Sequence, residues 1–141
     1  MEKWLDQKNE AGKQSELFVL QYEQNRMNDH SSFEKIELIS DVYVNAGYDI
    51  ISFNDLDSFI IDRFIEVKSY REEISFYWSK NEVEKAKELA TKYYIYLVDR
   101  SLMNKKDYVP KIIQDPYKKI FENEFWKKET ENWKIILEQR V

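Results

Sequence analysis

Apolar residues recur along parts of the chain at the spacing typical of helices. Residues 12–27 have one apolar side and carry polar side chains elsewhere, and we predict a helix there; its apolar members are Leu17, Phe18, Val19, Leu20 and Tyr22. A second helix is predicted after Ser79, because Ser79 and Glu82 form an S-x-x-E capping box. An apolar stripe supports that helix and consists of Val83, Ala86, Leu89 and Ala90. A third helix is predicted from Pro116 to about residue 128.

Other segments are rich in strand formers and are bounded by turn residues. They read KIELISDVY, YDIISF, FIIDRFIEVKSY, ISFYWS, YYIYLVD, VPKII and NWKIIL, at residues 35–43, 48–53, 59–70, 74–79, 93–99, 109–113 and 132–137. The sequences NAG and NDLDS supply turns between the first three strands. Because a helix lies between two strand-like runs, a β-α-β crossover is expected. This order predicts an α/β domain with a mixed central β-sheet flanked by helices.

Length and composition restrict the classes of protein that fit. The 141 residues suit one domain, and the aromatic content of 16% supplies large side chains for a core. The absence of cysteine excludes disulfides and thiolate-bound zinc, and the single histidine disfavours histidine metal sites and serine-histidine triads. No apolar run is long enough to span a membrane, and the polar N-terminus lacks an export signal. We therefore expect a cytoplasmic protein without a membrane partner.

The net charge of -5 argues against a protein that coats nucleic acid through charge alone. It leaves room for acidic residues gathered at a cation site. Neither GxxxxGK[ST] nor GxGxxG occurs, so glycine-rich phosphate loops are disfavoured.

Charged residues inside two strand-like runs are the main candidates for chemistry. Side chains alternate along a strand, so Glu66 and Lys68 share one face of residues 63–70, about 7 Å apart. If the strands flanking NDLDS form a hairpin, Asp49 comes alongside Glu66. Two carboxylates, waters and a substrate phosphate are the ligands that Mg²⁺ favours. A lysine nearby adds charge stabilisation, and together these groups could hydrolyse a phosphodiester.

The alternative is an ordinary solvated ion pair between Glu66 and Lys68, which would contribute little. Chance matches are expected in a chain with 35% charged residues. However, Glu66-Val67-Lys68 is the single E-x-K triplet in the sequence, and it falls in an apolar strand. Spacing alone leaves both interpretations open.

Asp49 with Glu66-Val67-Lys68 resembles the D…(D/E)xK signature of the PD-(D/E)xK, restriction-endonuclease-like nucleases, with Tyr48 in place of the usual proline. More narrowly, the chain resembles the NO VEIN C-terminal domain family. Five features carry this resemblance: Gly12 with Glu16, Gly47-Tyr48-Asp49-Ile50, Ile65-Glu66-Val67-Lys68, Ser79 with Glu82, and the tyrosines from Tyr93 to Tyr96. They place one nuclease-like domain over residues 1–141, with a core at about 12–99 and an extension at about 100–141. Ser15 stands where relatives tend to have glycine.

The resemblance implies a restriction-endonuclease-like core and a metal-dependent phosphodiesterase acting on DNA, of restriction or phage-defence type. It implies Mg²⁺, with Mn²⁺ as a substitute, held by Asp49, Glu66 and the backbone carbonyl of Val67. Lys68 would position or deprotonate the attacking water and offset phosphate charge. Glu16 would be an auxiliary catalytic residue, with an ordinary exposed helix carboxylate as the alternative. A helicase- or ATPase-type partner or fused domain is expected, so the chain would be an excised domain or a small partner subunit. Cutting both strands would need two sites, hence a homodimer or a partner nuclease.

A rival hypothesis is a non-catalytic module that keeps the nuclease fold and binds DNA or protein, since fold does not fix function. Several other residues have both an ordinary and a functional interpretation. Ordinary roles are favoured for Glu23 as an exposed helix carboxylate, Glu82 as a helix cap, Lys80 and Lys85 as solvated lysines, and His30 as a loop residue. The aromatic residues Tyr70, Phe76, Tyr77 and Trp78 are expected in the core rather than stacked on bases, and Trp126 and Trp133 in the core or at a partner surface.

Overall fold

The computed structural model describes residues 2–40, 42, 43 and 45–129. Two α-helices and five strands make up most of this part of the chain. In chain order they are α1 (Glu2–Arg26), β1 (Glu37–Leu38), β2 (Ile50–Ser52), β3 (Arg63–Tyr70), α2 (Lys80–Leu89), β4 (Tyr93–Asp99) and β5 (Lys111–Gln114). Three short helical turns accompany them, at Phe33–Lys35, Ala90–Lys92 and, as a π-helical turn, Tyr117–Phe121.

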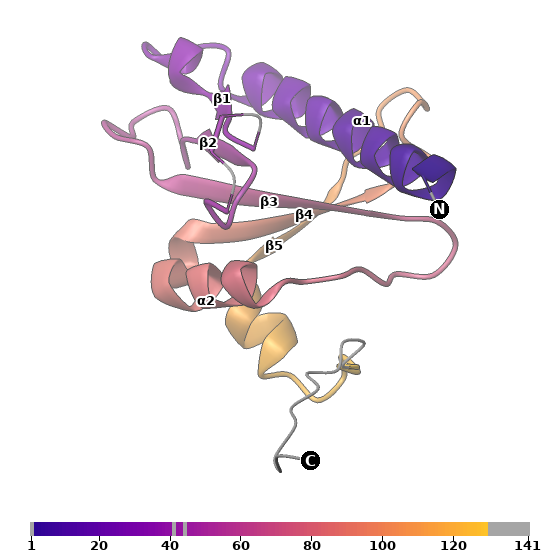
Figure 1. Ribbon diagram of the computed structural model, residues 1–141. Helices are drawn as coiled ribbons and strands as arrows, with labels where there is room; N and C mark the ends of the chain where they lie inside the picture. The colour runs from indigo at the N-terminus through magenta and orange to yellow at the C-terminus, as the bar shows by residue number, and fades with distance from the viewer. Residues whose placement is uncertain (1, 41, 44, 130–141) are drawn as a thin grey trace, which may run out of the picture.

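The strands form one mixed sheet in the order β1-β2-β3-β4-β5 (Figure 1). The β1-β2, β2-β3 and β4-β5 pairs are antiparallel, whereas β3 and β4 are parallel. Strands β3 and β4 are joined through α2, so the predicted β-α-β crossover is confirmed. The hairpin around NDLDS is confirmed as well, because Ile50 pairs with Ile65 across β2 and β3.

Each face of the sheet is covered by one α-helix, α1 on one side and α2 on the other (Figure 1). Alternation along β3 sends Ile65 and Val67 into the core under α1, while Phe64 lies in the core under α2. Strand β4 is buried on both faces from Tyr93 to Val98, as expected for the strand that pairs in parallel at the centre of such a sheet. The predicted α/β fold is therefore confirmed.

The segment ISFYWS is not a strand, and that prediction was wrong. Residues 74–79 carry no ladder pairing and lie in the return connection between β3 and α2 (Figure 1). Phe76 and Trp78 instead pack edge-on against each other at 6.3 Å and against the core under α2. Their apolar pattern therefore reflects ring packing along an extended connection, because both neighbours of β3 are already present in the sheet.

Other boundaries also differ from the sequence-based predictions. The first helix begins at Glu2, the strand predicted at 35–43 is reduced to β1, and the helix predicted from Pro116 is limited to the turn at Tyr117–Phe121. The β1 strand is short because the chain turns back at once, with the amides of Val42 and Tyr43 donating to the carbonyl of Ile39, each at 2.9 Å. The strand predicted at 132–137 and Trp133 lie outside the described residues.

The NAG turn brings the start of β2 against α2. Asn45 and Gly47 have φ values of 67° and 89°, in the left-handed region that favours glycine. A Cβ atom on Gly47 would lie 2.8 Å from the Cβ of Lys85, so the turn and α2 pack at a distance that only glycine allows. This contact fixes α2 beside the residues that follow Gly47.

None of the helices within the described residues has both the length and the apolar content needed to cross a bilayer.

Candidate functional site

Asp49 is held at the end of the β2-β3 hairpin by two hydrogen bonds to β3. Its backbone N–H donates to the carbonyl of Ile65 at 2.8 Å. Its side chain accepts the N–H of Val67 at 2.8 Å, so the carboxyl group takes the place of the next ladder partner. Since Val67 adjoins Glu66, the predicted approach of Asp49 to Glu66 follows directly from the register of this hairpin.

Glu66 and Lys68 project from β3 toward α2. Lys68 Nζ lies 3.4 Å from the carboxylate of Glu66 and 2.8 Å from that of Glu82. Glu82 also closes the capping box of α2: it accepts the amide of Ser79 at 3.1 Å, and Ser79 Oγ accepts the amide of Glu82 at 3.1 Å. The predicted helix cap is thus confirmed, and the same carboxylate carries a contact to Lys68 that the cap motif did not indicate.

Glu16 reaches the same region from α1, on the opposite face of the sheet. The hydroxyl of Ser40 donates to Glu16 Oε1 at 2.5 Å, and the charge of Glu16 acts on the carboxyl group of Asp49. Ser40 itself follows β1, and its amide donates to the carbonyl of Asp49 at 3.3 Å. The structure therefore brings Glu16 close to Asp49 through the short loop after β1.

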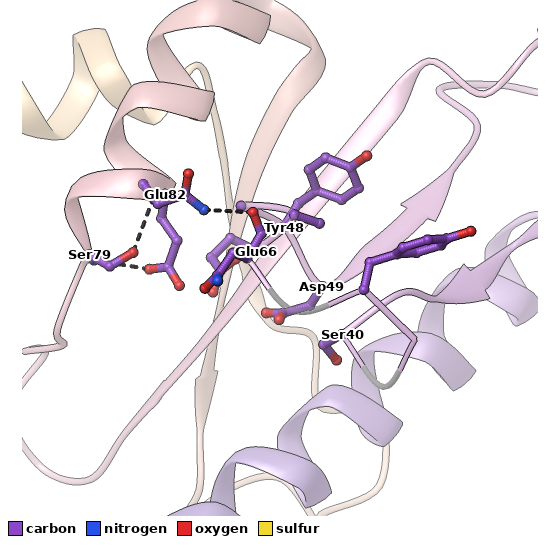
Figure 2. A pocket seen from close by; sticks show the side chains of 11 residues that line it. Ser40, Tyr48, Asp49, Glu66, Ser79 and Glu82 are labelled. Carbon is purple, nitrogen blue, oxygen red and sulfur yellow. Dashed lines mark hydrogen bonds between the residues drawn. The ribbon is translucent and has the colours of Figure 1, made fainter.

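A cavity of about 200 Å³ lies beside the carboxyl groups of Asp49, Glu66 and Glu82 (Figure 2). Ser40, Asp49, Glu66, Ser79 and Glu82 line it, together with the turn residues 45–47 and two tyrosines. Tyr48 lies on the other side of the Asp49 and Glu66 carboxyl groups from Ser79 and Glu82 (Figure 2). The volume is below the range of about 300–1,000 Å³ typical of small-molecule pockets, so it suits an ion or a single phosphate group better than a large ligand.

Burial and the charge of a neighbouring acid raise the pKa of each carboxyl group. Burial is the main cause for Asp49, and with the charge of Glu16 it outweighs the Val67 hydrogen bond and raises the pKa of Asp49 to about 7. Burial also raises the pKa of Glu66 well above its usual range, and the charge of Asp49 adds to the increase. Glu66 is only 4% exposed. Two acids in this state gain stability from a proton or a cation placed between them.

Lys68 remains a cation in this environment. Burial lowers the pKa of its ammonium group, but the carboxylates of Glu66 and Glu82 outweigh burial, so the pKa is raised. The side chain is 14% exposed, and its ammonium contacts Glu66 and Glu82, two of the residues that line the cavity. A protonated lysine can donate to a phosphate oxygen or to water, but it has no lone pair with which to accept a proton.

The two carboxylates of Asp49 and Glu66 could bind one hard cation, but they do not surround it with protein ligands. Among residues 2–129, with 41 and 44 left aside, no three acidic or histidine side chains converge as a metal-binding group. The N–H and C=O of a strand residue point to the same side, so the Val67 carbonyl points toward Asp49, as its N–H does. Asp49, Glu66 and this carbonyl would leave the remaining positions to water and substrate, which is the usual state of protein-bound Mg²⁺.

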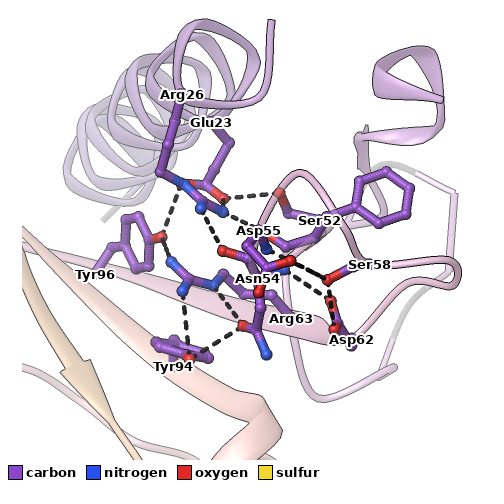
Figure 3. Close-up of polar contacts among 11 residues, drawn as sticks. Glu23, Arg26, Ser52, Asn54, Asp55, Ser58, Asp62, Arg63, Tyr94 and Tyr96 are labelled. Atoms are coloured by element: carbon purple, nitrogen blue, oxygen red, sulfur yellow. Dashed lines mark hydrogen bonds and ion pairs between the residues drawn. The ribbon is translucent and has the colours of Figure 1, made fainter. Parts of the chain in front are cut away.

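Glu23 is not the exposed carboxylate that the sequence suggested. It is fully buried and connects α1 to the sheet (Figure 3). It accepts the hydroxyls of Ser52 at 2.7 Å and Tyr96 at 2.8 Å, and forms an ion pair with Arg26 at 2.5 Å. The short polar residue Ser52 in an otherwise apolar strand was the one sequence signal for a buried acceptor at this place.

The remaining candidates have structural roles. His30 is buried, stacks on Phe53 at 3.9 Å, and uses both ring nitrogens in contacts with Ser32 and Ser58. Lys85 pairs with Glu88 at 3.0 Å, and Lys80 is exposed. Of the predicted core aromatics within residues 2–129, all but Tyr77, which is 60% exposed, pack against the core under α2; they are Tyr70, Phe76, Trp78 and Trp126.

The fold and the site define an α/β domain in which two carboxyl groups and a lysine converge where an antiparallel hairpin meets a β-α-β unit. Residues 15–113 match the family described as protein NO VEIN, C-terminal, and the chain belongs to that family. The match confirms the family predicted from the sequence and includes β5, which continues the sheet beyond β4. Comparisons with curated proteins and with solved structures gave no match.

Proposed function

We propose that this domain is a metal-dependent phosphodiesterase acting on DNA, with a PD-(D/E)xK, restriction-endonuclease-like site. The observation that carries the proposal is the hydrogen bond from the Val67 amide to Asp49, which places the Asp49 carboxyl beside Glu66 and Lys68. A solvated ion pair between Glu66 and Lys68 would not need a second, half-buried acid beside it whose pKa is raised to about 7. Placing the Asp49 and Glu66 carboxyl groups together therefore destabilises the fold, and a bound cation would offset this destabilisation.

Each residue has a role that its contacts support. Asp49, Glu66 and the Val67 carbonyl would hold Mg²⁺ or Mn²⁺, and the Lys68 ammonium would offset charge on the phosphate. When bound, Mg²⁺ would supply polarisation of a phosphate oxygen and a lower pKa of water. Because Lys68 is protonated, we assign it charge stabilisation rather than the role of base. Glu16 acts on Asp49 through its charge.

The rival function is a binding module that retains the nuclease fold. It is favoured by one observation: Lys68 is engaged by two carboxylates, at 3.4 and 2.8 Å, and in this arrangement its charge is largely neutralised within the protein. Three further proposals depend on the catalytic function: a restriction or phage-defence role, a helicase- or ATPase-type partner, and a homodimer.

Plasmid nicking in Mg²⁺ separates the two functions. Asp49→Asn keeps an acceptor for the Val67 amide and removes the negative charge of a metal ligand, so we expect cleavage to fall by on the order of 10²-fold or more. Lys68→Met keeps the aliphatic stem and should lower the rate to a similar degree. Asp57→Asn, on an exposed loop, is the matched control and should keep wild-type activity. Undiminished cleavage in folded Asp49→Asn would rule out the catalytic assignment.

Calorimetry with Mg²⁺ gives a second readout that does not depend on turnover. Wild-type protein and Asp57→Asn should bind the ion, and Asp49→Asn should bind it at least about tenfold more weakly, the lower end of the scale for damage to a metal site. Equal binding by wild type and Asp49→Asn would place the ion elsewhere on the protein.

A further inference from the structure

An open groove of about 700 Å³ adjoins the carboxylate cavity. The two share a wall made of Tyr43, Asn45, Ala46, Tyr48 and Asn81. Beyond this wall the groove is mainly apolar, and its remaining lining residues are Ile39, Ile51, Ile61, Phe64 and Lys85. Its volume lies within the range of sites that hold small organic groups, whereas the carboxylate cavity is smaller than that range.

The wall between the cavity and the groove carries two tyrosines. Tyr43 is 63% exposed at the surface of the groove. Tyr48 packs edge-on against Phe64, with ring centroids 5.0 Å apart, so its ring is fixed in orientation. Tyr48 directly precedes Asp49 in the chain. A planar group stacked on these rings would therefore lie next to the carboxyl groups of Asp49 and Glu66.

The charge of the domain limits what the groove can bind. The net charge is -5, and Lys68 and Lys85 in this region are both paired with glutamates, at 2.8 and 3.0 Å. These charges therefore disfavour binding through many phosphate contacts. Aromatic faces bind bases without any such charge, and every base offers a face.

We infer that this groove binds an unpaired nucleobase of the strand whose phosphate lies at Asp49 and Glu66. Within an intact duplex each base is stacked on its neighbours, so its faces are not available to Tyr43 or Tyr48. The substrate class is therefore DNA with an unpaired nucleotide at the scissile position, such as a strand end, a flap or an extruded base. This inference rests on the proposed function and adds the form of DNA that the site accepts.

Fluorescence anisotropy tests the groove without cleavage. The probes are a single-stranded DNA of about 12 nucleotides and a fully paired duplex of the same sequence. Ca²⁺ replaces Mg²⁺ as a hard cation that takes oxygen ligands, and a gel confirms that the strands stay intact. We expect the wild-type protein to bind the single strand more tightly than the duplex.

Two variants and one control locate the binding. Tyr43→Ala removes an exposed ring, and Tyr48→Leu keeps apolar bulk but removes the aromatic face; each should weaken single-strand binding by about five- to 100-fold. Tyr77→Ala is the matched control, because Tyr77 is 60% exposed and lies outside both linings. Loss in the groove variants with no loss in the control supports the inference.

The outcomes separate this inference from the proposed function. Equal affinity for the two probes, no oligonucleotide binding, or equal affinity of all three variants would overturn the groove assignment even if plasmid cleavage depends on Asp49. Groove-dependent binding of the single strand, without Mg²⁺-dependent cleavage of either that strand or the plasmid, would support the groove and overturn the catalytic function.

Discussion

The ionised form of Asp49 destabilises the folded protein, because its carboxyl group is partly removed from water and lies near other acids. Its pKa is about 7 in the folded state against 3.8 for an unperturbed side chain. Between these pH values the folded state binds more protons than the unfolded state. The free energy of unfolding therefore decreases as the pH rises toward 7 and levels off above it. Glu66, whose pKa is also raised, acts in the same direction.

We predict that Asp49→Asn stabilises the protein more at high pH than at low pH. The amide cannot ionise, so at about pH 8 the variant should exceed wild type by about 1 kcal/mol or more, and at about pH 5 by less. Urea denaturation at both pH values measures the difference, with Asp57→Asn as the control. A stability gap of the same size at both pH values would contradict the raised pKa.

At the residue scale, the sequence predicted the positions that share one strand. Glu66 and Lys68 are two residues apart on β3, so alternation alone placed them on one face. Glu82 was assigned only its cap, because its contact with Lys68 depends on how α2 crosses the sheet. Glu23 was misjudged because burial of a helix carboxylate is decided by partners on other elements, here Ser52 and Tyr96.

At the scale of single elements, the cap of α2 couples helix stability to the site. Ser79 accepts the amide of Glu82, and Glu82 in turn contacts Lys68. Ser79→Ala should lower the free energy of unfolding by about 0.5–2 kcal/mol, the usual cost of losing such a cap. Ser75→Ala, an exposed serine in the preceding connection, is the control. If thermal or urea unfolding shows the two variants to be equally stable, the cap does not hold this helix.

The helix α1 is fixed to the sheet through Glu23, one heptad from Glu16 on the same helix face. Glu23→Ala would remove the acceptor of the Tyr96 hydroxyl and the ion-pair partner of Arg26. We expect a loss of about 3 kcal/mol, at the lower end for a broken buried pair because Arg26 is partly exposed. Glu10→Ala, exposed on α1, should change stability by less than about 0.5 kcal/mol. Similar urea midpoints for the two variants would show that the network (Figure 3) adds no stability.

Helices and strands were predictable where a local sequence signal was strong. The predictions failed where packing between elements determined the conformation. The capping box and the apolar run of β4 gave α2 and β4 with nearly correct limits. The segment 74–79 has the composition of a strand, but its rings pack under α2 and not in a ladder. The length of β1 was set by the turn that follows Ile39, which the alternation of KIELISDVY did not indicate.

At the scale of the whole molecule, the acidic balance constrains how the domain can hold DNA. A net charge of -5 with lysines paired locally allows only a few phosphate contacts near the site. For single strands the slope of log affinity against log salt is about -0.7 for each phosphate neutralised, so one or two contacts give a slope of about -1. Affinity should therefore fall by no more than about tenfold between about 50 and 200 mM salt.

Titration of the single-stranded probe at several salt concentrations, with Ca²⁺ held constant, measures this slope. Lys85→Ala should change the slope by much less than the roughly 0.7 that one phosphate contact contributes, because Lys85 is already paired with Glu88. A slope of about -4 or steeper would mean that many cationic side chains meet the phosphates. In that case the strand would be held by a basic surface rather than by the tyrosines beside Asp49.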